Sequence, residues 1–135
     1  MAAALGPYRT SAVVTVRWAA CGMVITGLKK NWDSTSYTTD EPHCLRRTDG
    51  PKVYPGDLDG EVHDDGEIWS HALWDINRSL GRTTANRIIL ESQFFFNPTI
   101  TMPAAAQQTV AAARALYGPR AAAKVTKAFH DRGIL

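Results

Sequence analysis

The sequence has little net charge and no long hydrophobic run. The formal net charge at pH 7 is only +2, and the basic residues neither gather on one helix face nor alternate with aromatic residues, which argues against a nucleic-acid-binding protein. The most apolar stretch, residues 12–25, is interrupted by Arg17 and is shorter than the roughly 18 residues that a membrane-spanning helix needs. No small-residue cleavage site follows it, so we expect no membrane span and no clear signal peptide.

The short motifs that carry many kinds of catalysis are also missing. None of the four histidines is followed by glutamate, so the two-histidine motif of zinc peptidases is absent. The sequence contains no glycine-rich phosphate loop, no serine in a nucleophile elbow and no Cys-x-x-Cys pair. Its two cysteines, Cys21 and Cys44, could form one disulfide or remain thiols, so they leave the redox compartment open.

The composition is that of an ordinary globular protein, with 44% hydrophobic and 21% charged residues, and the length of 135 residues indicates one domain or a piece of one. Residues 1–32 contain four basic residues and no Asp or Glu, and this asymmetry predicts a boundary near Trp32. We therefore divide the chain into a divergent segment, residues 1–31, and a domain, residues 32–135. The β-branched residues 13–16 indicate a short strand in the divergent segment.

Residues 32–60 are predicted to form a long irregular segment. Turn-forming residues are dense there, and each proline disfavours a helical conformation in the residue before it. Loops of this length in compact domains are usually functional or disordered. The aromatic residues Trp32, Tyr37 and Tyr54 favour an ordered segment.

The strongest helix signal follows this segment. Asp64 and Glu67, three residues apart, fit a capping box, which would leave His63 just outside the helix N-terminus. Gly81 stands where a C-terminal cap belongs. Between them, apolar residues recur at intervals of three and four, the spacing of one buried helix face: Ile68, Trp69, Ala72, Leu73, Ile76 and Leu80.

A second helix is predicted directly after Gly81. Thr83 or Thr84 provides its N-cap. Its apolar stripe extends to Phe95, and Asn97-Pro98 stops the helix. The stripe consists of Ala85, Ile88, Ile89, Ser92 and Phe95.

Two more helices complete the predicted fold. Thr101 caps a third helix with Pro103 in its first turn, and this alanine-rich helix ends at Gly118. A fourth helix runs from about Pro119 to Gly133. The sequence therefore predicts a mainly α fold, with about four helices after the long irregular segment.

Two arrangements of residues around His63 could carry chemistry. His63, Glu67 and His71 are spaced as i, i+4 and i+8, like zinc ligands on one helix face. The predicted helix starts after His63 and uses Glu67, so we interpret His71 as a polar-side or interfacial helix residue. His63 also follows Asp57 and Asp59. A carboxylate that binds one imidazole nitrogen fixes the direction of the other N–H, which can stabilise an oxyanion; the same residues also fit a purely structural histidine.

Several blocks of the sequence resemble one family, and they occur in the expected order. The blocks are Trp32-Asp33-x-Thr35-Ser36-Tyr37, Pro42-His43-Cys44-Leu45-Arg46-Arg47, Gly60-Glu61-Val62-His63-x-x-Gly66-Glu67-Ile68-Trp69-Ser70, Leu73-Trp74-Asp75-Ile76, Leu80-Gly81, Ala112-x-Arg114-Ala115-Leu116-Tyr117-Gly118 and Ala128-Phe129-x-x-Arg132-Gly133-Ile134-Leu135. They resemble the C-terminal lobe of the fungalysin family of secreted zinc metallopeptidases, particularly its bacterial members. The resemblance covers about residues 32–135.

The resemblance implies the helical C-terminal lobe of a thermolysin-like fold of two lobes. In such enzymes a histidine in a Val-His context faces the zinc across the cleft and stabilises the tetrahedral intermediate. The resemblance places His63 in this role and makes Asp57 or Asp59 the candidate that orients it. It further implies peptide or protein substrates, a zinc ion held by the preceding lobe, and an extracellular location. Cys44 resembles a disulfide cysteine of secreted relatives.

The sequence departs from the family at the zinc site. Residues 1–32 contain no histidine and no glutamate, so they can supply neither the zinc ligands nor the general base. We therefore expect a C-terminal fragment that lacks its N-terminal catalytic lobe, binds no metal by itself and is inactive alone. The alternative is a non-catalytic helical interaction module that uses the surface facing the missing lobe.

Overall fold

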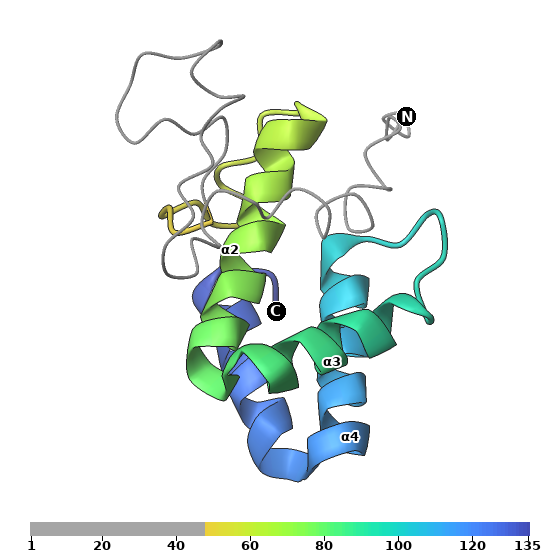
Figure 1. Ribbon diagram of the computed structural model, residues 1–135. Coiled ribbons are helices and arrows are strands. Elements are labelled where there is room, and N and C mark those ends of the chain that lie inside the picture. Colours follow the sequence, from red (N-terminus) through yellow and green to blue (C-terminus); the bar gives the residue numbers. More distant parts are fainter. Residues whose placement is uncertain (1–47) are drawn as a thin grey trace, which may run out of the picture.

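The computed structural model describes residues 48–135, which form three helices after an irregular segment, with no strand in this range (Figure 1). The helices are α2 (Val62–Leu80), α3 (Arg82–Gln93) and α4 (Met102–Asp131). The prediction of a mainly α fold is confirmed. The divergent segment 1–31 with its predicted strand, residues 32–47 and both cysteines lie outside the described residues. Within residues 48–135, no helix has the length and apolar character needed to cross a membrane.

The helix α4 consists of two helical segments that reverse direction at Gly118. Gly118 has φ 79° and ψ −174°, which are not helical angles, and Pro119 follows it. Figure 1 shows the first segment descending to this point and the second returning toward α2. Thr101 caps α4 as predicted, because its Oγ1 accepts a hydrogen bond from the Ala104 amide at 3.4 Å. The predicted third and fourth helices are therefore the two segments of α4.

The helix α2 begins earlier than predicted. Its N-cap is Glu61, whose Oε2 accepts hydrogen bonds from the amides of His63 and Asp64 at 3.0 and 2.9 Å. The predicted capping box of Asp64 and Glu67 is wrong, and His63 lies within the first turn of α2. Glutamate is not among the preferred N-cap residues, so the pattern of residue types concealed this start.

Gly81 connects α2 directly to α3. Its φ is 80°, and its amide donates to the Asn77 carbonyl at 2.9 Å, which ends α2. Its own carbonyl accepts from the Ala85 amide at 3.0 Å, so α3 starts at the next residue. The predicted cap at Thr83 or Thr84 is wrong because a single glycine with positive φ makes the whole turn and α3 has no side-chain cap.

The helix α3 is shorter than predicted at its C-terminal end. Ala85, Ile88 and Ser92 are buried, as expected. Phe95 lies beyond the end of α3 and is 59% exposed. Its place in the buried stripe was wrongly predicted, because the helical period stops at Gln93 and no longer directs Phe95 toward the core.

The core is centred on Trp69, which is 1% exposed. Its ring stacks on Phe129 of α4 with the ring centroids 5.1 Å apart, and the ring of Phe96 meets it edge-on at 6.4 Å. The Thr109 hydroxyl donates to the Ser92 hydroxyl at 3.2 Å, which joins α4 to α3. The predicted α2 stripe is buried, with Leu80 half-buried at its end. The alanines of α4 permit close approach of the helices, and many are buried: Ala105, Ala106, Ala112, Ala113, Ala121, Ala122 and Ala128.

The C-terminal residues attach the irregular segment to α2. Arg132 donates from Nε to the Asp75 carboxylate and from Nη1 to the Gly50 carbonyl, both at 2.8 Å. The Tyr54 amide donates to the Arg132 carbonyl at 2.8 Å. Residues separated by as many as 82 positions in the sequence therefore meet beside α2. Arg132 therefore has a structural role, since it joins the irregular segment to α2.

Gly133 should not tolerate alanine. Its φ is +68°, and a Cβ there would lie 2.2 Å from the Tyr54 carbonyl oxygen. We expect Gly133→Ala to lower the free energy of unfolding by about 2–4 kcal/mol, from backbone strain together with the steric clash. Denaturant unfolding measures this change. Gly56→Ala is the matched control, since nothing lies within 4 Å of its Cβ position; equal effects of the two substitutions would contradict the described contact.

Candidate functional site

The predicted catalytic residues lie at the start of α2 and in the segment before it. His63, Asp57 and Asp59 are all exposed. The Asp57 carboxylate accepts from the Val53 amide at 2.7 Å, and the Asp59 carboxylate accepts from the Glu61 amide at 2.8 Å. Each aspartate therefore orders the main chain just before α2. An orienting role of either aspartate toward His63 stays a prediction.

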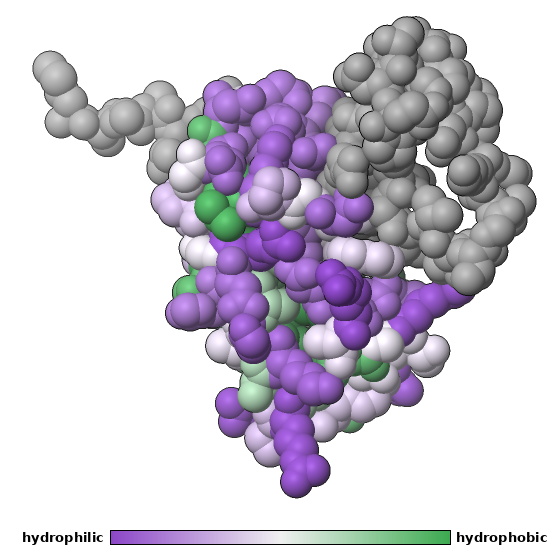
Figure 2. Space-filling model, turned by 90° about the vertical axis from the view of Figure 1, so that its left-hand side faces the viewer, coloured by the Kyte–Doolittle hydropathy of each residue, from purple (hydrophilic) through white to green (hydrophobic). Residues whose placement is uncertain are grey.

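The surface on this side of the molecule is polar. Figure 2 views the molecule from the left-hand side of Figure 1, where α2 and the irregular segment lie. Over its described part, this face is mainly hydrophilic, and hydrophobic residues come to the surface only in small separate areas. The residues at the start of α2, Glu61, Val62 and His63, are exposed.

Lys52 binds two acidic residues of α2, an interaction that the sequence pattern did not reveal. Its Nζ lies 3.1 Å from Glu67 Oε2 and also forms an ion pair with Asp64. Burial acts to lower the pKa of Lys52, but its hydrogen bonds to Asp64 and Glu67 and the charges of both carboxylates outweigh burial and raise the pKa above 10.5. Lys52 therefore holds the irregular segment against the first two turns of α2. The two carboxylates assigned to a capping box bind this lysine.

His71 is buried, not polar-side. It is 1% exposed, and its Nε2 accepts a hydrogen bond from the Gly50 amide at 3.2 Å. The interpretation as a polar-side residue is wrong, whereas an interfacial position agrees with the contact to the irregular segment. Its burial could have been predicted from the sequence, because His71 follows Ile68 by three residues and so lies beside the buried stripe of the helix.

The described residues do not assemble a metal site. Within residues 48–135, no group of three or more His, Cys, Asp or Glu side chains is placed to hold a metal ion. The spacing of His63, Glu67 and His71 does not create one. Glu67 is engaged by Lys52 and His71 by Gly50, while His63 is exposed in the first turn.

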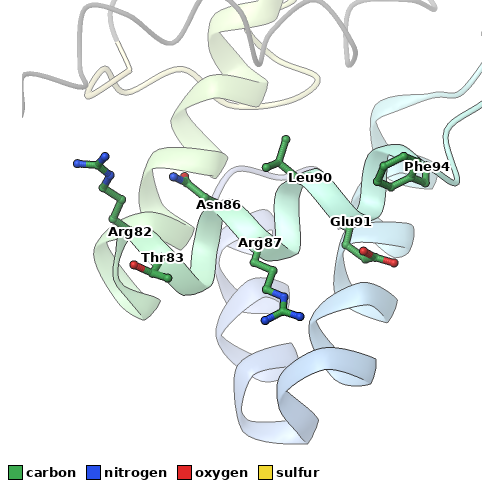
Figure 3. A pocket seen from close by; sticks show the side chains of 7 residues that line it. All are labelled: Arg82, Thr83, Asn86, Arg87, Leu90, Glu91 and Phe94. Atoms are coloured by element: carbon green, nitrogen blue, oxygen red, sulfur yellow. The ribbon is translucent and has the colours of Figure 1, made fainter.

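An open depression of about 430 Å³ lies along the outer face of α3. Sequence reasoning did not identify it. Figure 3 shows Asn86 and Leu90 directed to one side of the helix and Arg87 and Glu91 to the other. Its described lining combines two arginines with apolar and polar side chains: Arg82, Thr83, Asn86, Arg87, Leu90, Glu91 and Phe94. This mixture of charged, polar and apolar side chains fits a surface contact better than an enclosed ligand site.

Lys52→Met should test the electrostatic attachment of the irregular segment. We expect it to lower the free energy of unfolding at pH 8 by about 1 kcal/mol, because it removes a partly buried ion pair and leaves Asp64 and Glu67 to repel each other. The contribution of a group with a raised folded-state pKa is present below its unfolded value, 10.5 here, and is lost as the pH rises through the folded value. Denaturant unfolding should therefore show the two proteins converging above that pH. If the difference in the free energy of unfolding between the wild type and Lys52→Met stays constant from pH 8 to 11.5, the ion pair is excluded as its cause.

The comparisons with known proteins agree with the helical architecture. The sequence matches the family described as thermolysin metallopeptidase, alpha-helical domain, over residues 29–134. No curated protein and no solved structure matches the chain. The helices α2, α3 and α4 all fall inside the matched range. The chain therefore belongs to the thermolysin-like metallopeptidases, as their C-terminal α-helical domain.

Proposed function

We propose that the chain is the C-terminal lobe of a zinc metalloendopeptidase of the fungalysin branch and forms one wall of its substrate cleft. The observation that carries the proposal is the position of His63, an exposed histidine in the first turn of α2, inside the family match. The substrates would be peptides or proteins. The family resemblance supports an extracellular enzyme.

His63 would act by donating an imidazole N–H to the oxyanion that forms when water attacks the peptide carbonyl. Such a donor is most effective when its position is fixed before the reaction. The main-chain amide of His63 is held by the Glu61 carboxylate at 3.0 Å, which fixes the backbone at this residue. The N-terminus of α2 adds a partial positive charge that favours a developing negative charge nearby.

Asp57 and Asp59 are the proposed orienting residues for His63. Each binds a main-chain amide through one carboxylate oxygen, Oδ2 of Asp57 and Oδ1 of Asp59. A carboxylate can accept through both oxygens, so the second oxygen is suited to accept from one imidazole nitrogen. The other nitrogen would then face the substrate.

The zinc ligands and the general base are assigned to an N-terminal lobe. The described residues do not fit a zinc site, since no suitable cluster of ligating side chains occurs in residues 48–135. We propose that residues 32–135 are the lobe proper and that residues 1–31 are unrelated to it. The family match starts at residue 29, three residues before this boundary. We further propose that the isolated chain binds no catalytic zinc and hydrolyses no peptides, because residues 1–32 contain no histidine and no glutamate.

Complementation tests this function. The purified chain with added zinc should not cleave casein. Mixed with a separately produced, zinc-loaded catalytic lobe of a thermolysin-like peptidase, it should restore turnover, and His63→Ala should lower kcat by about a hundredfold to a thousandfold because an oxyanion donor is lost. His130→Ala is the matched control, since His130 is an exposed histidine at the end of α4. Casein cleavage by the chain alone, or equal turnover with both variants, would contradict the proposal.

The second candidate function is a non-catalytic interaction module. The observation that favours it is an exposed apolar group at the C-terminal end of α3, where Leu90, Phe94 and Phe95 are 54%, 83% and 59% exposed. Exposed apolar groups of this kind often mark binding surfaces. Binding of the catalytic lobe without any turnover, abolished by Phe94→Ser with Phe95→Ser but not by His63→Ala, would favour this second function.

A further inference from the structure

The buried His71 lies where the irregular segment meets α2. Its side chain is 1% exposed, and its Nε2 accepts from the Gly50 amide at 3.2 Å across 21 residues of sequence. A nitrogen that accepts a hydrogen bond carries no proton, so this contact requires the neutral imidazole with its proton on Nδ1. The contact therefore exists in only one of the two protonation states of the ring.

Gly50 is held from both sides of its backbone. Its amide binds His71, and its carbonyl accepts from Arg132 Nη1 at 2.8 Å. The approach is close, because a Cβ at Gly50 would lie 2.8 Å from both Cε1 and Nε2 of the His71 ring. Glycine thus allows the main chain of the irregular segment to reach the imidazole directly.

We propose that His71 is a proton-sensitive attachment point, which holds the segment 48–60 on α2 while the imidazole is neutral and releases it when Nε2 is protonated. Protonation turns Nε2 from an acceptor into a donor and sets it against the Gly50 N–H. It also places a positive charge in a buried position, and the Arg132 guanidinium is bonded to the carbonyl of the same glycine. Both effects favour movement of the segment away from α2.

The two acidic residues of α2 that lie one turn from His71 are each bound to a cation. Asp75, one turn after His71 on α2, is already bonded to Arg132, and Glu67, one turn before it, is bonded to Lys52. The segment itself contributes Asp49, which is exposed, and Lys52. Among the described residues, the titratable and charged groups near this contact are therefore Asp49 and Lys52 from the segment, Glu67 and Asp75 from α2, and Arg132 from the end of α4.

Release at His71 would alter the surroundings of the α2 N-terminus. The same segment carries Lys52, which pairs with Asp64 and Glu67, and Asp59, whose amide donates to Asp65 Oδ1 at 3.0 Å. Loss of the Gly50 contact therefore weakens the hold of the segment on the first two turns of α2. This inference goes beyond the proposed catalytic function and does not depend on it.

Amide hydrogen exchange of the full chain tests the proposal. The protection factor of the Gly50 amide, measured by NMR and corrected for the intrinsic pH dependence of exchange, should fall about tenfold between pH 7.5 and 5, the loss of one net hydrogen bond. In His71→Gln, whose side-chain oxygen can still accept but does not titrate, protection should stay constant over this range. His130→Gln, at an exposed position, should behave like the wild type.

If His71→Gln does not fold, the pH titration of the His71 ring resonances in the wild type tests the proposal instead. In the wild type, protonation of His71 Nε2 should coincide in pH with the loss of Gly50 protection. Constant Gly50 protection down to pH 5 would overturn the proposal, as would a ring that titrates without any change in protection. The same loss of protection in a folded His71→Gln would overturn it too.

Discussion

The structure depends first on the packing of Trp69 against Phe129. The two rings stack with centroids 5.1 Å apart, and both are essentially fully buried. Truncating a buried aromatic residue of this size typically costs about 3–5 kcal/mol, a large part of the stability of a small domain. This contact joins the middle of α2 to the last turns of α4, and the reversal at Gly118 makes it possible because it brings the second segment of α4 back to α2 (Figure 1).

The polar contacts of Arg132 follow from that packing. With Phe129 fixed, Arg132 three residues later reaches Asp75 on α2 and Gly50 in the irregular segment. Gly133 then passes close to the Tyr54 carbonyl, and Ile134 is 2% exposed. The packing of Phe129 thus positions the Arg132 guanidinium, which binds the main-chain carbonyls of Gly50 and Lys52. The C-terminal residues of the chain therefore hold the irregular segment, although the two are far apart in sequence.

The sequence predicted the features that depend on local periodicity and on glycine. The α2 stripe from Ile68 to Ile76 is buried as expected because burial of an amphipathic face is set by spacing alone. Gly81 and Gly118 were identified as breaks because few other residues adopt positive φ easily. The resemblance to the thermolysin-like lobe is confirmed by the family match.

The starts of helices and the contacts of the site were harder to predict because they depend on tertiary structure. Glu61 caps α2 although its residue type is a poor capping signal. Whether Glu67 caps a helix or binds a lysine depends on where Lys52 lies, and no local pattern reports that position. His71 was misread for the same reason, since its partner Gly50 is 21 residues away.

The central claim is that this lobe presents His63 to a catalytic centre carried by another lobe. The most direct measurement uses a catalytic lobe of a thermolysin-like peptidase in which paramagnetic cobalt(II) replaces zinc, added to the chain with isotope-labelled histidines. The account predicts that the His63 ring signals shift and broaden on binding, whereas those of the exposed His130, at the end of α4, do not. A complex in which the lobes bind and the His63 signals remain unchanged would contradict it.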